Sequence, residues 1–145
     1  MKKKLILSIV LVITAISCSK TPNRLFELSN ENLESDNIEQ AIVNLNKIVK
    51  NYPNDSLASK AQYKIASIYL NWKNDLNNGF IQLQNTTTSY SNSVQGEQAQ
   101  SEIDQFPEYI INKAESLRKR KMLKEAVDHL MYMTDKYSAH ELTPK

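Results

Sequence analysis

The sequence has few residues that break regular structure, with two glycines and four prolines in 145 residues. A β-sandwich needs a turn signal about every eight to twelve residues, so this scarcity argues against one and favours helices joined by short connections. A single cysteine excludes a disulfide bond within the chain. With 41% hydrophobic and 23% charged residues, the length fits one domain and not a large multidomain enzyme or a disordered polar tail.

The sequence also carries little net charge. Its formal charge of +2 includes Lys2, Lys3 and Lys4, which lie in a segment that we expect to be removed, and their loss brings the charge to about −1. A nearly neutral chain lacks the excess of basic residues that is typical of nucleic-acid-binding domains. We therefore do not expect nucleic acid as a partner.

Residues that carry catalytic chemistry are scarce as well. The two histidines are His129 and His140. His129 follows Asp128, but adjacent positions on a helix do not face each other, so we expect a surface histidine and not an acid–base pair. The sequence has no HExxH, GxSxG or Walker-type loop, and two glycines cannot build a phosphate cradle. We expect no enzyme activity, metal site, cofactor or small-molecule substrate.

The N-terminus has the pattern of a targeting segment. Three lysines precede the apolar run of residues 5–16, as the n-region precedes the h-region in a secretory signal. The twelve residues of this run would span about 18 Å as a helix, short of the roughly 30 Å hydrocarbon core of a bilayer. We therefore interpret the run as a signal and not as a transmembrane helix.

The apolar run ends in Ala-Ile-Ser-Cys at residues 15–18. This sequence resembles the lipobox of bacterial lipoproteins, with alanine where that motif usually has leucine. The resemblance implies that residues 1–17 are a cleaved signal peptide, that Cys18 is lipidated, and that residues 18–23 form a short tether. Three acyl chains, as in that family, would anchor the protein firmly, since burial stabilises by about 0.8 kcal/mol per CH₂. The alternative is a free thiol in an ordinary signal peptide.

The residue after the cysteine bears on location. Ser19 stands where lipoproteins retained at the inner membrane of enteric bacteria have aspartate. By this resemblance we expect the bacterial outer membrane, on its periplasmic face. The short tether predicts that the folded part, residues 24–145, lies close to the membrane surface.

The rest of the chain contains an internal repeat. In three places a small residue is followed eleven residues later by tyrosine: Ala41 and Tyr52, Gly79 and Tyr90, Ala126 and Tyr137. The fourth and seventh residues after each small residue fall on the same helical stripe as the small residue itself. A second helical pattern precedes each copy. Each unit is therefore expected to contain two helices.

Seven helices follow from these patterns. Their expected ranges are about 24–34, 37–50, 56–72, 76–89, 94–105, 107–120 and 122–137. The small residues are 38 and then 47 residues apart, so we interpret 94–106 as an additional helix that Pro107 separates from the next unit. The alternative to a repeat is a plain antiparallel bundle whose alanines and leucines fill a core.

The pattern resembles the tetratricopeptide repeat, a helix-turn-helix unit of about 34 residues with two characteristic small positions. Residues 107–140 match best, with Ala114 and Ala126 in the small positions, and Ala41 fits the second half of an earlier copy. The likeness covers about residues 24–140. It implies an all-α fold in which antiparallel helix pairs stack as a short solenoid and bind partners on a concave face.

An aromatic cluster and a basic run have ordinary structural explanations. We expect the aromatic residues near the turn after residue 72 to fill the core, with Tyr63 left over to line the concave surface; they are Tyr63, Tyr69, Trp72 and Phe80. The basic run at 118–121 falls at a helix C-terminus, where cations complement the macrodipole. In the alternative interpretation, Arg118 and Arg120 bind anionic lipid headgroups, lipopolysaccharide or an acidic partner.

The last helix is expected to lack a neighbour on one side. Val127 follows Ala126 as Ile42 follows Ala41, which directs its side chain to where the first helix of a further repeat would stack. An uncovered apolar side chain forgoes roughly 1.5 to 3 kcal/mol. We therefore predict that Val127, Met131 and Thr134 form an exposed strip for a partner, or else that the chain is a fragment of a longer protein.

Together these features predict a lipid-anchored scaffold that mediates protein–protein interaction in the bacterial envelope. The loop at residues 52–58, Tyr-Pro-x-x-Ser followed by alanine, resembles that of the BamD-like family, which supports assembly of outer-membrane β-barrel proteins. The alternative is an accessory lipoprotein that associates with peptidoglycan or polysaccharide. The expected partners are envelope proteins or peptides and, through the acylated Cys18, the lipid bilayer.

Overall fold

The computed structural model describes residues 20–143, so the signal segment and Cys18 lie outside the described residues. Within this range the regular structure is entirely helical. The helices are α2 (Pro22–Glu34), α3 (Ile38–Asn51), α4 (Ser56–Asn71), α5 (Leu76–Ser89), α6 (Val94–Asp104), α7 (Phe106–Lys119) and α8 (Leu123–Lys136). For residues 20–143 the prediction of an all-α fold with seven helices is confirmed, and each helix begins and ends within two residues of its expected bounds.

Side-chain caps and proline set the starts of the helices. Asp55 accepts a hydrogen bond from the first turn of α4 at 2.8 Å, and Asp75 and Ser93 do the same for α5 and α6 at 3.0 Å. Each cap satisfies a backbone N–H that has no partner inside the helix. Pro107 lies in the first turn of α7, where its missing N–H costs nothing.

The tight turns within the helix pairs share one backbone conformation. Asp36, Asn74 and Lys121, which follow α2, α4 and α7, have φ angles of 59°, 50° and 61°. Each of them lies five residues before the small residue of its repeat. A left-handed residue at this place ends the first helix and reverses the chain. The pairs are therefore α2 with α3, α4 with α5, and α7 with α8.

The turn that follows each second helix is repeated too. In each copy the tyrosine carbonyl accepts a hydrogen bond from the backbone N–H three residues later. The donors are Asp55 to Tyr52 at 3.0 Å, Ser93 to Tyr90 at 2.9 Å, and His140 to Tyr137 at 2.8 Å. The three copies that the tyrosine spacing predicts thus have the same turn in the structure.

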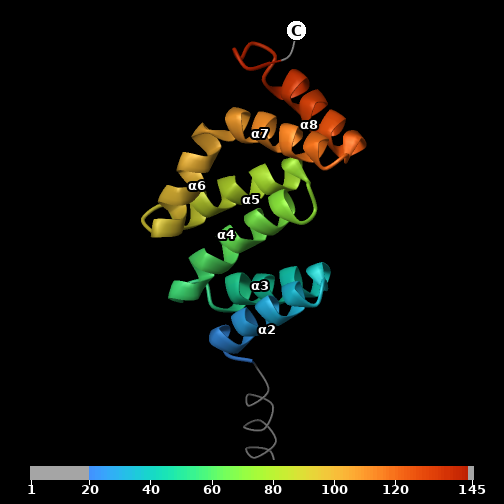
Figure 1. Cartoon of the computed structure of the whole chain (residues 1–145). Helices are drawn as coiled ribbons and strands as arrows, with labels where there is room; N and C mark the ends of the chain where they lie inside the picture. The colour runs from blue at the N-terminus through green and yellow to red at the C-terminus, as the bar shows by residue number, and fades with distance from the viewer. Residues whose placement is uncertain (1–19, 144–145) are drawn as a thin grey trace, which may run out of the picture.

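The helix pairs stack in one direction. Within each pair the helices pack against each other, while α3 contacts α4 and α5 contacts α6 between pairs. In Figure 1, α2 and α8 lie at opposite ends of the stack. This arrangement confirms the predicted short solenoid of antiparallel helix pairs.

Two apolar clusters hold the stack together. The first joins α2, α3 and α4 around Leu45 and Ile65, and the second joins α4 to α8 around Phe106 and Met133. Helix α4 contributes buried side chains to both clusters. The two clusters therefore meet at α4.

The longer second interval, the 47 residues from Gly79 to Ala126, is explained by a break between two helices. Only Gln105 separates α6 from α7, and the chain turns sharply there (Figure 1). Helix α6 lies on α5 and touches α4, whereas α7 packs on α8. Ala99 of α6 is buried like Ala61 of α4, its counterpart 38 residues earlier. The additional helix expected at 94–106 is thus present, and it covers α5 as α4 covers α3.

Candidate docking surfaces

The face of α8 that points away from α7 repeats positions that are covered elsewhere in the stack. Ile42 on α3 is 6% exposed, whereas Val127, at the same step of its repeat, is 52% exposed. Leu76 at the start of α5 is 5% exposed, and its counterpart Leu123 is 61% exposed. Helices α4 and α6 cover the earlier copies. Among the described residues, no helix covers α8 in the same way.

We define the α8 face by four residues of one stripe: Leu123, Val127, Met131 and Thr134. Met131 is 64% exposed, and Thr134 is exposed with its hydroxyl donating to the carbonyl of Leu130 at 2.6 Å. Val127, Met131 and Thr134 therefore have the exposure that the sequence predicts. Their role in binding a partner remains a prediction.

The chain beyond α8 repeats the cap of an earlier first helix. The imidazole Nδ1 of His140 accepts a hydrogen bond from Leu142 N–H at 3.2 Å, as the Asp55 carboxylate accepts one from Leu57 N–H at 2.8 Å. Thr143 N–H then donates to the carbonyl of His140 at 3.0 Å. Residues 140–143 thus have the hydrogen bonds of the start of a helix, at the place where α4 and α6 begin after their own turns.

The opposite end of the stack is polar. The outer side of α2 carries Arg24, which pairs with Glu27 at 3.3 Å and with Glu31 at 2.8 Å. All three side chains are largely exposed. The two ends of the solenoid therefore present different chemistry, charged on α2 and apolar on α8.

The basic run lies at the end of α7. Arg118 and Lys119 occupy its last turn and pair with Glu115 at 3.8 and 3.1 Å, and Arg120 is the C-cap. The hydrogen bond from Lys119 lowers the pKa of Glu115. Arg118 and Arg120 are both exposed. Their position fits the favoured helix-end interpretation, and contact with a partner remains a prediction.

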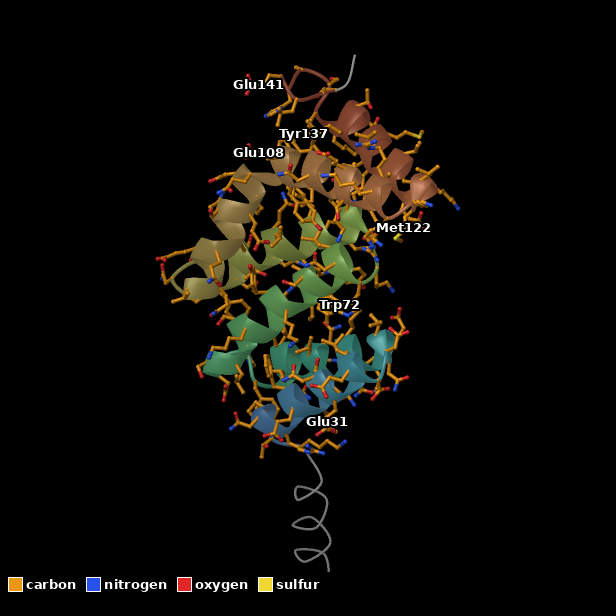
Figure 2. All side chains as sticks on the ribbon, viewed as in Figure 1. Glu31, Trp72, Glu108, Met122, Tyr137 and Glu141 are labelled. Carbon is orange, nitrogen blue, oxygen red and sulfur yellow. The ribbon has the colours of Figure 1, made fainter. Side chains whose placement is uncertain are left out.

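The structure corrects the order of burial among the aromatic residues. Tyr63 is half-buried, and its hydroxyl donates to the carboxylate of Glu102 on α6. Trp72, expected in the core, is the C-cap of α4 and is 51% exposed (Figure 2). Phe80 does pack in the second cluster, with its ring centroid 4.9 Å from that of Phe106. The residue left over is therefore Trp72, because α6 covers Tyr63.

His129 is also placed differently from the prediction. It is 2% exposed and not at the surface. His129 lies three residues after Ala126, as Asn44 lies three residues after Ala41. Asn44 is buried on α3, and His129 faces inward from α8 for the same reason. Its Nδ1 donates to the carbonyl of Glu125 at 2.8 Å, while Nε2 has no partner among the described residues. Burial lowers the pKa of the imidazole.

One hollow was not predicted. It lies between α4 and the corner of α6 and α7, and residues of all three helices line it. A signal for it exists in the sequence, since no lysine or arginine occurs between Lys73 and Lys113. That signal was missed because a stretch without positive charge has no motif or periodicity of its own.

Neither a candidate metal site nor a candidate membrane span occurs among residues 20–143. Over residues 20–143, no group of three or more histidine, cysteine, aspartate or glutamate side chains is placed to hold a metal ion. None of the helices α2 to α8 has both the length and the apolar character needed to cross a bilayer.

Comparison with known proteins bears on the first helix pair. A family model of the tetratricopeptide repeat matches residues 28–55, from the middle of α2 through α3 to the turn before α4. The match falls on this pair and not on residues 107–140, which the sequence pattern predicts to be the best copy. Curated proteins give no match to the chain. Residues 28–55 thus match one tetratricopeptide repeat, a unit that generally serves as a scaffold for protein–protein interaction.

Proposed function

We propose that this chain is a lipid-anchored scaffold of the bacterial envelope whose α8 face docks a helix of another envelope protein. The observation that carries the proposal is the contrast between Ile42, covered by α4, and Val127, exposed at the same step of its repeat. Each exposed apolar side chain of this face that becomes fully buried against a partner contributes roughly 1.5 to 3 kcal/mol to the free energy of binding.

A helix is the expected occupant of the α8 face, because helices cover the equivalent faces elsewhere in the chain. Helix α4 lies on α3, and α6 lies on α5. Leu130 is half-buried on α8, while Leu45 and Leu83 at the same step are completely buried. A helix with an apolar stripe would complete this burial on α8 as α4 and α6 do on the earlier pairs.

The anchor rests on the sequence at residues 15–18, which resembles a lipobox. An acylated Cys18 would hold the stack next to the membrane, where its partners share the same surface. Confinement of both proteins to one surface raises their effective concentration, so that a modest docking face suffices.

The partner class follows from the resemblance to the BamD-like family. We favour a protein of the machinery that assembles outer-membrane β-barrels, with this chain at the periplasmic face of the outer membrane. Association with peptidoglycan or polysaccharide is the competing outcome of the test below.

The docking face is tested by crosslinking in native membranes followed by purification of the chain. Val127→Asp puts a charge at the centre of the α8 face and should lower recovery of the protein partner about tenfold or more, since such a charge costs more than about 1.4 kcal/mol when covered. Val43→Asp is the matched control, because Val43 is a partly exposed valine on α3 away from this face. Equal recovery with both variants, or retention on isolated cell wall with no protein partner, would contradict the proposal.

The anchor is tested separately. Cys18→Ala should move the protein from the detergent phase to the aqueous phase in a detergent partition experiment, and it should abolish incorporation of labelled palmitate. An unchanged partition would rule out the lipid anchor and would leave the docking face untouched.

A further inference from the structure

The hollow between α4 and the α6–α7 corner is small. Its volume is about 330 Å³, at the lower end of the range of roughly 300 to 1,000 Å³ for ligand pockets. Leu70, Phe106 and Tyr109 form its apolar wall. The rings of Phe106 and Tyr109 stack with their centroids 5.6 Å apart. An aliphatic chain can lie against such a wall, but a helix is too wide for the space.

Two carboxylates line the hollow, and more negative charge surrounds it. Glu102 and Glu108 are part of its lining. Asp104 and Glu141 line a smaller hollow that also includes Glu108. Figure 2 shows Glu108 and Glu141 on the same side of the molecule. The charged side chains that line the hollow are therefore both negative.

The side chains of two lysines, one on α4 and one in the α4–α5 turn, bond to residues on other helices. Lys64 donates to Asn30 on α2 at 2.5 Å, and the Lys73 ammonium pairs with Glu39 on α3. Among the described residues, neither Glu102 nor Glu108 belongs to an ion pair. The described part of the chain thus supplies no cation of its own to these carboxylates.

Glu102 is held in place by a tyrosine. The Tyr63 hydroxyl donates to its carboxylate. The Tyr109 hydroxyl donates to the carbonyl of Leu70 at 3.1 Å, and burial together with the charge of Glu102 raises the pKa of Tyr109 to about 12. A carboxylate fixed beside an apolar wall is ready to accept a charged donor without further ordering.

We propose that this hollow binds the side chain of a lysine or arginine from a partner polypeptide. The methylene stem lies against Leu70 and the aromatic wall, and the cation meets Glu102 and Glu108. An anionic ligand would be repelled, and a neutral apolar one would remove water from the carboxylates without replacing it. A basic side chain has an apolar stem that fits the wall and a positive charge that pairs with the carboxylates.

This site is separate from the proposed docking face. None of the residues that line the hollow belongs to the α8 face. A partner could use one surface without the other, so the two proposals stand or fall independently.

The test is fluorescence anisotropy with the full chain in a nonionic detergent. The probe is a fluorescein-labelled octapeptide of alternating lysine and serine, and its neutral counterpart has norleucine in place of lysine. We expect the lysine peptide to bind and the norleucine peptide to bind at least about tenfold more weakly, as the loss of two charge-assisted contacts implies. Spermidine serves as a competitor, and displacement at a dissociation constant equal to that of the peptide would identify a free polyamine as the ligand and overturn the proposal.

Variants locate the binding. Glu102→Gln with Glu108→Gln should weaken binding of the lysine peptide about tenfold, whereas Glu34→Gln with Glu97→Gln, which removes the same charge from exposed positions, should change it less than about twofold. Glutamine at residue 102 can still accept the Tyr63 hydrogen bond. If that double variant does not fold, Glu108→Gln alone carries the test, because Glu108 is exposed and its side chain makes no hydrogen bond within the described residues.

Two more variants complete the design. Asn112 is exposed at the edge of the hollow, and Asn112→Lys places an ammonium of the chain itself there, which should abolish binding. Val43→Asp, which adds a negative charge to α3 away from both surfaces, should leave peptide binding unchanged. Equal weakening by both pairs of glutamine variants, equal binding of the norleucine peptide, or full binding by Asn112→Lys would each overturn the proposal.

Discussion

A Cβ atom added to Gly96 would lie 2.1 Å from the carbonyl oxygen of Tyr90. The contact joins the first turn of α6 to the end of α5, and the neighbouring backbone atoms of Tyr90 and Ser91 lie within 3.1 Å of the same point. Ala58 occupies the corresponding step of α4. Helix α6 therefore begins closer to the preceding helix than α4 does.

This contact predicts different costs for the two glycines. Gly96→Ala should lower the free energy of unfolding by about 1 to 3 kcal/mol, since the backbone of Tyr90 has to move. Gly79→Ala should cost less than Gly96→Ala, because its Cβ meets the buried side chain of Leu70 and not backbone, so that repacking of one side chain relieves the contact, and alanine favours the helix. Urea unfolding of both variants measures the difference, and a Gly96→Ala protein as stable as the wild type would refute the close approach.

The left-handed residue between α7 and α8 offers a stabilising change. Lys121 has a φ of 61°, which strains a residue with a side chain and suits glycine. We expect Lys121→Gly to raise the free energy of unfolding by about 0.5 to 1 kcal/mol. Lys119→Gly is the matched control, since it removes the same charge from the last turn of α7, has no left-handed φ to relieve, and should not raise the free energy of unfolding. Equal destabilisation by the two variants would contradict the assigned turn.

Burial of His129 predicts a pH effect on stability. Its pKa is lowered in the folded state, so the unfolded chain binds the proton more tightly, and the free energy of unfolding falls as the pH drops below the ordinary histidine value of about 6.5. The loss ends at the lowered pKa of the folded state. His129→Gln should remove this contribution. We expect the stability difference between wild type and variant to shift in favour of the variant between pH 7.5 and pH 5.0, and a constant difference would contradict the buried position.

The end of α5 is predicted to open early. Residues 86–89 are three threonines and a serine, and the hydroxyls of Thr86 and Thr88 donate to carbonyls four residues back at 2.8 Å. Such residues are weak helix formers because their χ1 angles are restricted and their hydroxyls compete with the backbone. In amide hydrogen exchange we expect this turn to exchange before Leu83. Strong protection from Thr86 through Ser89 would show the opposite.

The repeat itself could be predicted because it depends on spacing. The distance from Ala41 to Tyr52 places both residues on one stripe, and the same spacing from Ala126 to Tyr137 marks the last pair, so the helices and their order follow from local patterns. Val127 could be predicted for the same reason, since its exposure follows from its step in the repeat.

Other features depend on contacts between distant segments. Tyr63 and Trp72 are both aromatic residues of one helix region, and only the approach of Glu102, 39 residues after Tyr63, decides which of the two is covered. His129 resembles a surface residue by type, and its burial becomes clear only when it is aligned with Asn44. The hollow at the corner exists because the chain bends between α6 and α7 at Gln105. No local sequence pattern predicts the angle of that bend.

The charged outer side of α2 and the apolar α8 face constrain how copies of this chain can associate. Head-to-tail stacking would cover Val127 with the Arg24, Glu27 and Glu31 side chains and would remove water from those charges without replacing it. An open filament of copies is therefore disfavoured. Among the described residues the exposed apolar face lies at one end of the stack, so self-association through it favours a twofold pair in which α8 meets α8, and such a pair is closed.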